Sequence, residues 1–467
     1  MIIMAKHRCF VILVFLFQIV FSCSAHAHLE KAKFFPPDGN ANDSFGISVA
    51  IDGNIAVVGA YLNDSNGSDC GAVYVYELSG SQWIAKQKLV PSDGSTNDQF
   101  GRSVAIEGNT IVVGSYYGDS NEPNTGSAYV FSRLGSVWTQ QQKLIAPDAA
   151  ENDRFGCSVS IDNNTIVIGA YRCNIYTGCA YVFVRTGSNW SFQQKLTASD
   201  AETGDYFGYS VAIDNNIIII GAMNDDHSGF DYAGSAYLYK KQDATWLEQD
   251  ILRASDSGPP HHRFGAAVAL DGNWAVVGAY EGNADVVSGA GAAYVFANTD
   301  VGWVEQQKLF DANSPAYGDD FGWAVAIKND TILAGCVNDS VNGKQAGAVF
   351  EFVRTGSTWV QSDRLTPGDA NTDDKFGSSL ALSGRHIIIG APYNSNNGKS
   401  TGSAYIFDNF PGDLDADGDV DFFDFAVLAG CWRQNNLLAD IAPAPSGDGI
   451  VDIKDLAVLC DNWLAGK

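Results

Sequence analysis

The sequence predicts an all-β fold in which one four-stranded antiparallel unit is repeated seven times and closed into a ring. Three observations support this. Each copy carries four short runs rich in β-branched and aromatic residues, separated by Gly, Asn and Asp, which favours strands over helices. A seventh outer strand is supplied only by the N-terminal segment. Phe-Gly recurs at a nearly constant interval, at Phe45, Phe100, Phe155, Phe207, Phe264, Phe321 and Phe376. A four-stranded repeat of this period predicts a seven-bladed β-propeller over residues 28–408.

Within one copy, the order of the expected strands is clear. In the second copy they cover residues 103–106, 110–115, 127–131 and 138–144. The first two are joined by a tight turn, "EGN" here and "DGN" or "DNN" elsewhere, whose residues tolerate the positive φ angles of a hairpin. Gly at the end of the second run and at the start of the third permits a tight bend or close backbone approach.

Ring closure follows from a count of the outer strands. The outer run "W…KL" occurs six times, beginning at Trp83, Trp138, Trp190, Trp246, Trp303 and Trp359. The seventh copy stops at "SAYIFD" (403–408) without one, whereas "LEKAKFF" (29–35) stands alone near the N-terminus. We therefore expect the N-terminal strand to complete the seventh blade and cover its open edge.

Residues 1–27 are typical of a secretory signal. Lys6 and Arg8 precede an apolar run from Cys9 to Phe21, and Ala25-His26-Ala27 offers a cleavage site. A lipoprotein signal ending at Cys23 is the alternative. The run is too short for a comfortable membrane span and no later segment resembles one. The predicted location is extracellular, with attachment to the cell surface left open.

The charge is strongly acidic. The formal net charge is −26, and of the 54 acidic residues 44 are Asp and 10 are Glu. Such a chain lacks the basic footprint that nucleic acids require, so nucleic acid is excluded as an expected partner. Asp favours turns and oxygen-rich cation sites, which makes Ca²⁺ the first cofactor to consider.

Seven cysteines remain after residue 27, so at least one is unpaired. Cys173 and Cys179 flank one short loop and could form a disulfide in an oxidising compartment. Cys336 stands where other copies have a small residue, which predicts a buried position. A bridge between Cys431 and Cys460 is conceivable but not favoured.

The seven units resemble FG-GAP repeats, the blades of the integrin α-chain head. The resemblance spans residues 29 to about 408 and implies that Phe packs between neighbouring blades while Gly lets the chain turn into the inner strand. Calcium-binding blades of the family carry an Asp-rich cage between their first two strands. Here that connection is only a tight turn, so the family's propeller calcium sites are not expected and an adhesion function is in doubt.

The longest loops are acidic and share one face of the expected propeller. An acidic residue stands two positions before Phe in six copies, and His262 takes its place in the remaining one; the candidate binding residues are Asp43, Asp98, Asp153, Asp205, Asp319 and Asp374. The favoured interpretation is that each Asp accepts hydrogen bonds from its own loop backbone. The alternative is a ring of carboxylates that binds a ligand with the help of a cation.

Catalysis finds little support in the sequence. Zinc-protease and phosphate-loop motifs are missing from it. Acidic residues are so abundant that a glycosidase-like pair can be neither singled out nor excluded.

A separate module is predicted for residues 411–467. In "PGDLDADGDVDFFDF" the acidic residues follow an EF-hand-type calcium loop, with Gly418 at its sharp turn. The expected ligands are Asp413, Asp415, Asp417, Asp419 (through its carbonyl), Asp421 and Asp424. After the loop, Phe425, Leu428 and Trp432 are spaced for one apolar helix face.

The loop and helix recur in "SGDGIVDIKDLAVLCDNW" (446–463), with the expected ligands Asp448, Ile450 (through its carbonyl), Asp452 and Asp455. The first two ligand positions fall on Ala444 and Ser446, and Asp440 could substitute only by bulging past the prolines, so this site is expected to be weaker. The duplication resembles a type I dockerin, which implies calcium binding and docking to a cohesin-type domain. The resemblance assigns partner contacts to Phe423 and Lys454.

Together these features predict a secreted, non-catalytic binding or scaffolding protein. The propeller would present its loop face to a protein or glycan ligand, and the C-terminal module would dock to a larger assembly. Two alternatives stay open. One is an extracellular polysaccharide-degrading enzyme, a glycoside hydrolase or polysaccharide lyase, because dockerins often accompany such enzymes. The other is a surface adhesin.

Overall fold

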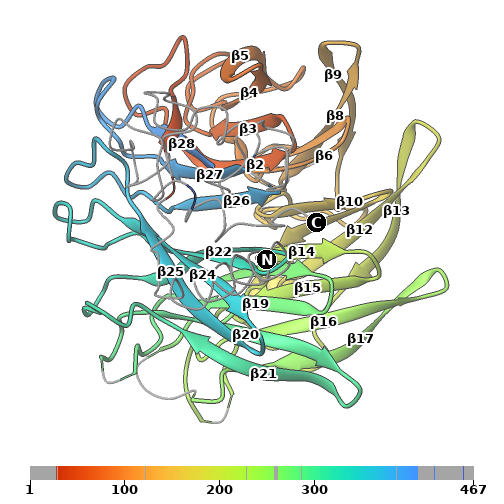
Figure 1. Cartoon of the computed structure of the whole chain (residues 1–467). Coiled ribbons are helices and arrows are strands. Elements are labelled where there is room, and N and C mark those ends of the chain that lie inside the picture. Colours follow the sequence, from red (N-terminus) through yellow and green to blue (C-terminus); the bar gives the residue numbers. More distant parts are fainter. Residues whose placement is uncertain are drawn as a thin grey trace, which may run out of the picture. The chain divides into compact units, whose positions relative to one another are not determined.

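The computed structural model describes residue 28 and residues 30–408, apart from 121, 228, 257–260, 286 and 385, together with the single positions 425 and 456. Glu30–Phe407 forms one compact unit (Figure 1). It contains seven four-stranded antiparallel sheets, which confirms the predicted all-β, seven-bladed propeller.

Each blade uses four strands that are consecutive in the chain, except the last blade, which borrows the first strand. Blade 1 contains β2 (Phe45–Asp52), β3 (Ile55–Ala60), β4 (Ala72–Ser79) and β5 (Gln82–Leu89). Blade 2 contains β6 (Phe100–Glu107), β7 (Thr110–Ser115), β8 (Ser127–Leu134) and β9 (Val137–Leu144). Blade 3 contains β10 (Val159–Asp162), β11 (Thr165–Ala170), β12 (Cys179–Thr186) and β13 (Asn189–Leu196), with the single turn α2 (Cys173–Tyr176) before β12.

Blade 4 contains β14 (Phe207–Asp214), β15 (Ile217–Ala222), β16 (Ser235–Gln242) and β17 (Thr245–Leu252). Blade 5 contains β18 (Ala267–Asp271), β19 (Trp274–Ala279), β20 (Ala292–Thr299) and β21 (Gly302–Leu309). Blade 6 contains β22 (Phe321–Lys328), β23 (Thr331–Cys336), β24 (Ala348–Thr355) and β25 (Thr358–Leu365). Blade 7 contains β26 (Ser379–Ser383), β27 (His386–Ala391), β28 (Ser403–Asp408) and β1 (Glu30–Phe34).

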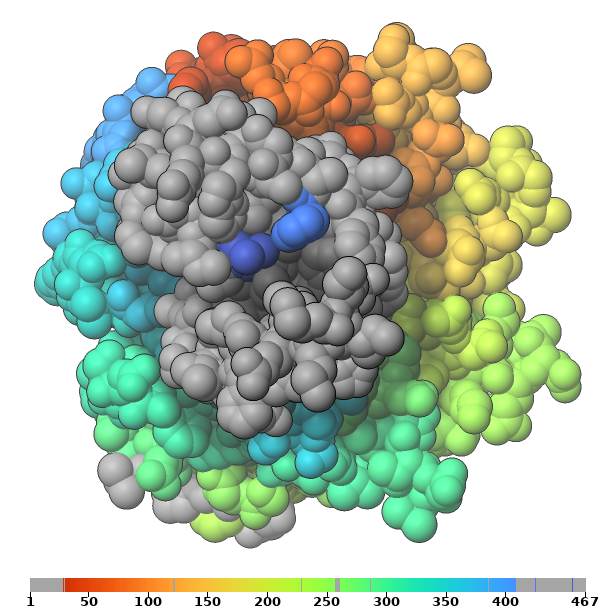
Figure 2. Space-filling model, in the orientation of Figure 1, coloured from red at the N-terminus to blue at the C-terminus, as the bar shows by residue number. Residues whose placement is uncertain are grey.

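The first strand of each blade lines the centre of the ring, and successive first strands contact one another in a closed cycle from β2 through β26 and back to β2. Figure 2 shows the colours following the chain around the periphery, with the blue of the last blade beside the red of the first strands. Two-residue turns join the first and second strands throughout, as between Asp52 and Ile55. These turns are too short to supply the many oxygen ligands of a calcium cage.

The N-terminal strand closes the ring as predicted. β1 pairs antiparallel with β28, with Lys33 opposite Tyr405 and Phe34 opposite Ala404. Phe34 is 3% exposed and its ring stacks on Tyr76 of blade 1, with 4.1 Å between centroids. The last blade is therefore joined to both ends of the repeat array, and its edge is paired.

The Phe-Gly pair packs between blades, as the resemblance implied. Phe100 is fully buried in a cluster that contains Val57 and Val73 of blade 1 with Ile111 and Tyr129 of blade 2. The backbone of each Phe approaches a glycine of the preceding blade very closely. A Cβ on Gly126, whose φ is +87°, would lie 2.0 Å from the carbonyl oxygen of Phe155. Only glycine fits there, because it has the required φ and no side chain.

Candidate ligand-binding site at the mouth of the central channel

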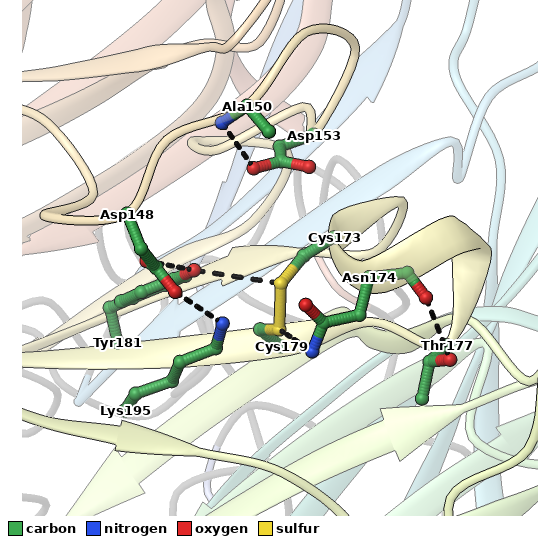
Figure 3. Close-up of a disulfide and its surroundings, with 9 residues drawn as sticks. All are labelled: Asp148, Ala150, Asp153, Cys173, Asn174, Thr177, Cys179, Tyr181 and Lys195. Carbon is green, nitrogen blue, oxygen red and sulfur yellow. Dashed lines mark hydrogen bonds and ion pairs between the residues drawn. A yellow bond between two sulfur atoms is a disulfide. The ribbon is translucent and has the colours of Figure 1, made fainter.

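The six candidate aspartates before Phe-Gly are buried, with exposures of 1% to 9%. Each accepts a hydrogen bond from the backbone N–H three residues earlier, at 2.6 to 2.9 Å; the pairs are Asn40–Asp43, Ser95–Asp98, Ala150–Asp153, Glu202–Asp205, Ala316–Asp319 and Asn371–Asp374. Figure 3 shows the bond between Ala150 and Asp153. The structure thus supports the interpretation in which these residues shape their own loops. Ligand binding by them stays a prediction.

The blade that lacks the aspartate supports the same interpretation. His262 occupies the position and is fully buried, with neither ring nitrogen hydrogen-bonded in the described part of the chain. The residue three positions earlier is Pro259, which has no backbone N–H to donate. The blade without a backbone N–H at this position is therefore also the blade without the accepting aspartate.

Burial gives these carboxyl groups raised pKa values. Desolvation, reinforced by neighbouring acids and opposed by the backbone hydrogen bond, raises the pKa of Asp205 and of Asp319 to about 6. The pKa values of Asp43, Asp98, Asp153 and Asp374 are also raised, with burial as the largest cause.

A second set of aspartates carries a repeated network on the same loops. In Figure 3, Tyr181 donates a hydrogen bond to Asp148 at 2.9 Å, and Lys195 pairs with the other carboxylate oxygen at 2.6 Å. Tyr, Asp and a basic residue recur in six blades, centred on Asp38, Asp93, Asp148, Asp200, Asp256 and Asp369. The basic residue of the last network is Lys33 of β1. Many of the acidic loop residues therefore serve structural networks.

Several residues that directly follow Phe-Gly or the second strand of a blade come together near the ring axis. They enclose a cavity of about 260 Å³ whose lining comes from six blades: Arg102, Tyr116, Cys157, Tyr171, Tyr209, Ala266, Tyr280, Trp323 and Ser378. These positions stand at the start of the first strands or just after the second strands. The cavity therefore opens at the loop face, at the mouth of the channel.

The cavity walls are largely aromatic. Tyr171 lies 5.2 Å from Tyr206 and 5.6 Å from Tyr209, and Tyr280 lies 5.0 Å from Trp323, measured between ring centroids. Trp323 keeps 39% of its surface exposed. The cavity thus offers flat apolar faces edged by hydroxyl groups, which is common in small-ligand sites.

Arg102 is the one lining residue that is ionised at neutral pH. Burial raises the pKa of Tyr116 and of Tyr171 to about 12, and that of the Cys157 thiol to about 11, so these groups stay neutral. The Arg102 guanidinium lies 5.9 Å from the ring centre of Tyr61 and 5.7 Å from that of Tyr116. No ion pair within the described residues includes Arg102.

Arg154 stands behind this wall. It is 5% exposed, and its guanidinium lies 3.6 Å from the ring centre of Tyr117 and 5.9 Å from that of Tyr116. Its Nη2 donates to Asn152 at 3.4 Å, whereas Nε and Nη1 are buried without a hydrogen-bond partner among the described residues. Burial lowers the pKa of Arg154.

A strained loop follows the cavity residue Tyr171 in the chain. Asn174, Ile175 and Tyr176 in α2 have φ angles of 52°, 60° and 65°, which ordinary side chains rarely adopt consecutively. A disulfide between Cys173 and Cys179, which the sequence left as a possibility, closes this loop (Figure 3). Tyr176 is 42% exposed and lies 6.1 Å from Tyr206 between ring centroids. Strain of this kind is typical of functional loops.

Cys70, Cys157 and Cys336 are free, and Cys336 is buried as predicted. Among the residues that the structure describes, no group of three or more His, Cys, Asp or Glu is arranged to hold a metal ion. None of the described helices has the length and hydropathy needed to cross a bilayer.

The residues predicted to bind calcium or a partner in the C-terminal module lie outside the described residues. They comprise the ligands Asp413, Asp415, Asp417, Asp419, Asp421, Asp424, Asp440, Asp448, Ile450, Asp452 and Asp455, and the contact residues Phe423 and Lys454. Residues 1–27 lie outside as well.

The cavity was not predicted from the sequence. Its signal was present in the aligned copies, where the position after Phe-Gly holds Tyr209 or Trp323 and the position after the second strand holds Tyr116, Tyr171 or Tyr280. Exposed aromatic residues at equivalent repeat positions indicate a surface for binding.

Comparison with known proteins agrees with the fold. The profile of the FG-GAP repeat family matches seven segments, residues 29–76, 83–131, 138–183, 190–239, 246–296, 303–352 and 359–407. Each match begins at an outer strand, and the first begins just before β1. Integrin alpha-11 from Homo sapiens is 32% identical over 126 residues, which is 24% of this chain and 10% of integrin alpha-11. The seven matches together cover most of the chain, which belongs to the FG-GAP repeat family.

Proposed function

We propose that this chain is a secreted, non-catalytic binding protein whose propeller holds a protein or glycan ligand at the loop face. The observation that carries the proposal is the channel-mouth cavity, because six blades converge there to hold aromatic walls around an arginine that has no ion-pair partner in the described structure. A closed ring is a rigid support for such a site. Similarity to an integrin α-chain over 24% of this chain supports a binding role.

Secretion is supported by two features. Residues 1–27 have the order of a secretory signal, with basic residues, an apolar run and small residues at the end. The disulfide between Cys173 and Cys179 suits an oxidising compartment.

We further propose that residues 411–467 fold around Ca²⁺ and dock to a cohesin-type domain. The support is the spacing of acidic residues around Gly418 and the second copy of the loop and helix pattern over residues 446–463. In this arrangement the propeller selects a ligand and the tail attaches the protein to an assembly.

The binding role is tested on arrays of extracellular proteins and glycans with the full chain. Replacing two exposed aromatic residues of the loop face together, in a Trp323→Ala/Tyr176→Ala variant, should abolish the signals that the wild type gives. Asn216→Ala, in a turn of the opposite face, should leave them intact. Wild-type signals that survive the double substitution, or that both variants lose, would contradict binding at the loop face.

A further inference from the structure

We propose that the channel-mouth cavity binds an acidic sugar residue, with its carboxylate paired to Arg102 and its ring covered by the surrounding aromatic side chains. This inference deepens the proposed function, on which it rests, by naming the ligand class and the residue that recognises it.

The first argument is electrostatic. The chain has 54 acidic and 28 basic residues, and most basic residues near the loop face are paired with carboxylates, as Lys195 is with Asp148. Arg102 and Arg154 are paired with none in the described structure. An arginine withdrawn from water without an anion is costly, since it loses hydration without gaining a charged partner. A site for an external anion accounts for this arrangement.

The geometry of the guanidinium points to a carboxylate. Arg102 is held from blades 1 and 2 by the rings of Tyr61 and Tyr116, at 5.9 and 5.7 Å. One hydrogen bond goes to the Tyr116 hydroxyl. The contacts to ring faces leave further N–H groups at the edge of the guanidinium available, and this edge matches the two oxygens of a carboxylate. The neutral hydroxyls of Tyr116 and Tyr171 add hydrogen-bond donors beside it.

The second argument is the shape of the cavity. About 260 Å³ is at the small end of ligand sites and suits one six-membered ring rather than a folded segment of polypeptide. A sugar ring has a flat face of C–H groups that packs on aromatic rings and hydroxyl groups around its edge. Tyr209, Tyr280 and Trp323 supply the aromatic surface, and Ser378 supplies a further hydroxyl.

An acidic peptide fits these features less well. The side chain of Asp or Glu would satisfy Arg102 but would leave the aromatic walls without a flat partner. Trp323 in the cavity wall is 39% exposed, and Tyr176 is 42% exposed. Tyr176 is linked to the wall residue Tyr171 through the ring of Tyr206, so the same kind of surface continues beyond the cavity. A chain of sugar residues could continue along these rings, with its acidic unit in the cavity.

The test is isothermal titration of the full chain with three acidic tetrasaccharides, built from galacturonate, glucuronate and mannuronate. Each is compared with its methyl ester, which keeps the sugar rings and removes the charge. We expect at least one acid to bind, and its ester to bind about 10- to 100-fold more weakly, because a charge-assisted hydrogen-bond pair is lost. Arg102→Gln should weaken the acid by a similar factor and leave the ester unchanged.

Arg354→Gln is the matched control. Arg354 also lies against an aromatic ring, 5.1 Å from the ring centre of Trp274, but it pairs with Asp330 beside a turn of the opposite face. This variant should bind like the wild type. Arg102→Lys, which keeps a charge without the planar fork, should fall between wild type and Arg102→Gln. Thermal unfolding of each variant shows whether the fold is intact.

Three results would overturn the proposal. If the acids and their esters bind equally, Arg102 does not recognise the carboxylate. If tetraglutamate binds and the sugars do not, the ligand is an acidic peptide rather than an acidic sugar. Absence of binding by all three acids at millimolar concentration would exclude an acidic sugar. In each case, array signals that still depend on Trp323 and Tyr176 would support the proposed binding function without the acidic sugar. If such array signals are absent, the acidic-sugar proposal and the proposed binding function both fail.

Discussion

At the scale of single residues, the acidic loops divide into two groups with opposite electrostatics. Asp205 and its equivalents are buried acceptors of backbone N–H groups, and burial raises the pKa of Asp205 to about 6. Asp148 is half exposed; burial opposes its charge, but hydrogen bonds from Lys195 and Tyr181 prevail and lower its pKa. Identical side chains in neighbouring loops therefore respond differently to pH.

This difference predicts the pH dependence of an Asp205→Asn variant. The folded pKa of about 6 exceeds the usual unfolded value of about 3.9, so ionisation destabilises the fold as pH rises through that window. The Asn carbonyl can still accept the Glu202 N–H. Asp205→Asn should therefore be more stable than wild type at pH 8, by about 1–3 kcal/mol. The difference in free energy of unfolding between Asp205→Asn and the wild type, measured by urea unfolding, should become smaller below pH 6 and vanish near pH 4.

Asp148→Asn should have the opposite effect and be less stable than the wild type at pH 8. The lowered pKa of Asp148 means that its ionised form stabilises the fold above the unfolded pKa, and this stabilisation is lost as pH falls. A wild type that exceeds Asp205→Asn in stability at pH 8 in metal-free buffer would refute the burial argument. Stabilisation of the wild type alone by added Ca²⁺ at pH 8 would favour the alternative in which these aspartates hold a cation.

At the scale of elements, the strand with the largest structural consequence is β1. It pairs with β28, supplies Lys33 to the Tyr405–Asp369 network and inserts Phe34 against blade 1. The chain thus joins its first and last repeats through side chains of the same kinds that the outer strands of the other blades use. Closing the ring in this way leaves blade 7 without an open edge.

Two adjacent phenylalanines test the closure. Phe34→Ala removes a ring that is 3% exposed and should lower the free energy of unfolding by about 3–5 kcal/mol. Phe35→Ala, at a side chain that is 49% exposed, should change it by no more than about 0.5 kcal/mol. Chemical unfolding followed by tryptophan fluorescence measures both. Equal effects would mean that β1 does not contribute to the core.

At the scale of the whole molecule, the propeller and the C-terminal module are expected to differ in their dependence on calcium. The turns between the first and second strands of each blade contain two residues, which leaves no space for an oxygen cage. In the C-terminal module, by contrast, folding is proposed to depend on Ca²⁺, since metal ligation and folding are coupled in small metal-binding domains.

A chelator should therefore change the midpoint of the propeller's main thermal transition by no more than about 2 °C. In most domains, a loss of about 1 kcal/mol of stability shifts this midpoint by more than that. The chelator should abolish the calcium heat measured by titration. A triple variant, Asp413→Ala/Asp417→Ala/Asp424→Ala, should lose that heat and the capture of a cohesin domain while keeping the main transition. Calcium binding that is unchanged in the triple variant would exclude this loop.

Much of the fold could be predicted because the determinants are local and repeated. Each copy contains its own strands, its own turn and its own Phe-Gly pair, and the outer "W…KL" run can be counted. The count leaves one strand missing at the C-terminal end and one spare at the N-terminal end, which allows only one closure. The short loop between Cys173 and Cys179 made a bridge possible, and the structure shows that it forms.

The candidate site could not be predicted in this way, because its residues are distant in sequence. Arg102, Tyr209 and Trp323 come from three different blades, and they meet only because the ring brings equivalent positions of different blades to one axis. Burial also depends on the ring. It is the packing of neighbouring loops that places Asp205 and its equivalents inside, where they bond to the backbone.

The sequence by itself therefore determined the number of blades, the strands of each blade and the manner of closure, since these follow from short-range patterns that recur. Only the tertiary structure decided which polar residues serve the fold and which remain available for a ligand, because hydrogen-bond partners, burial and unpaired charge arise from contacts between blades that no single repeat contains.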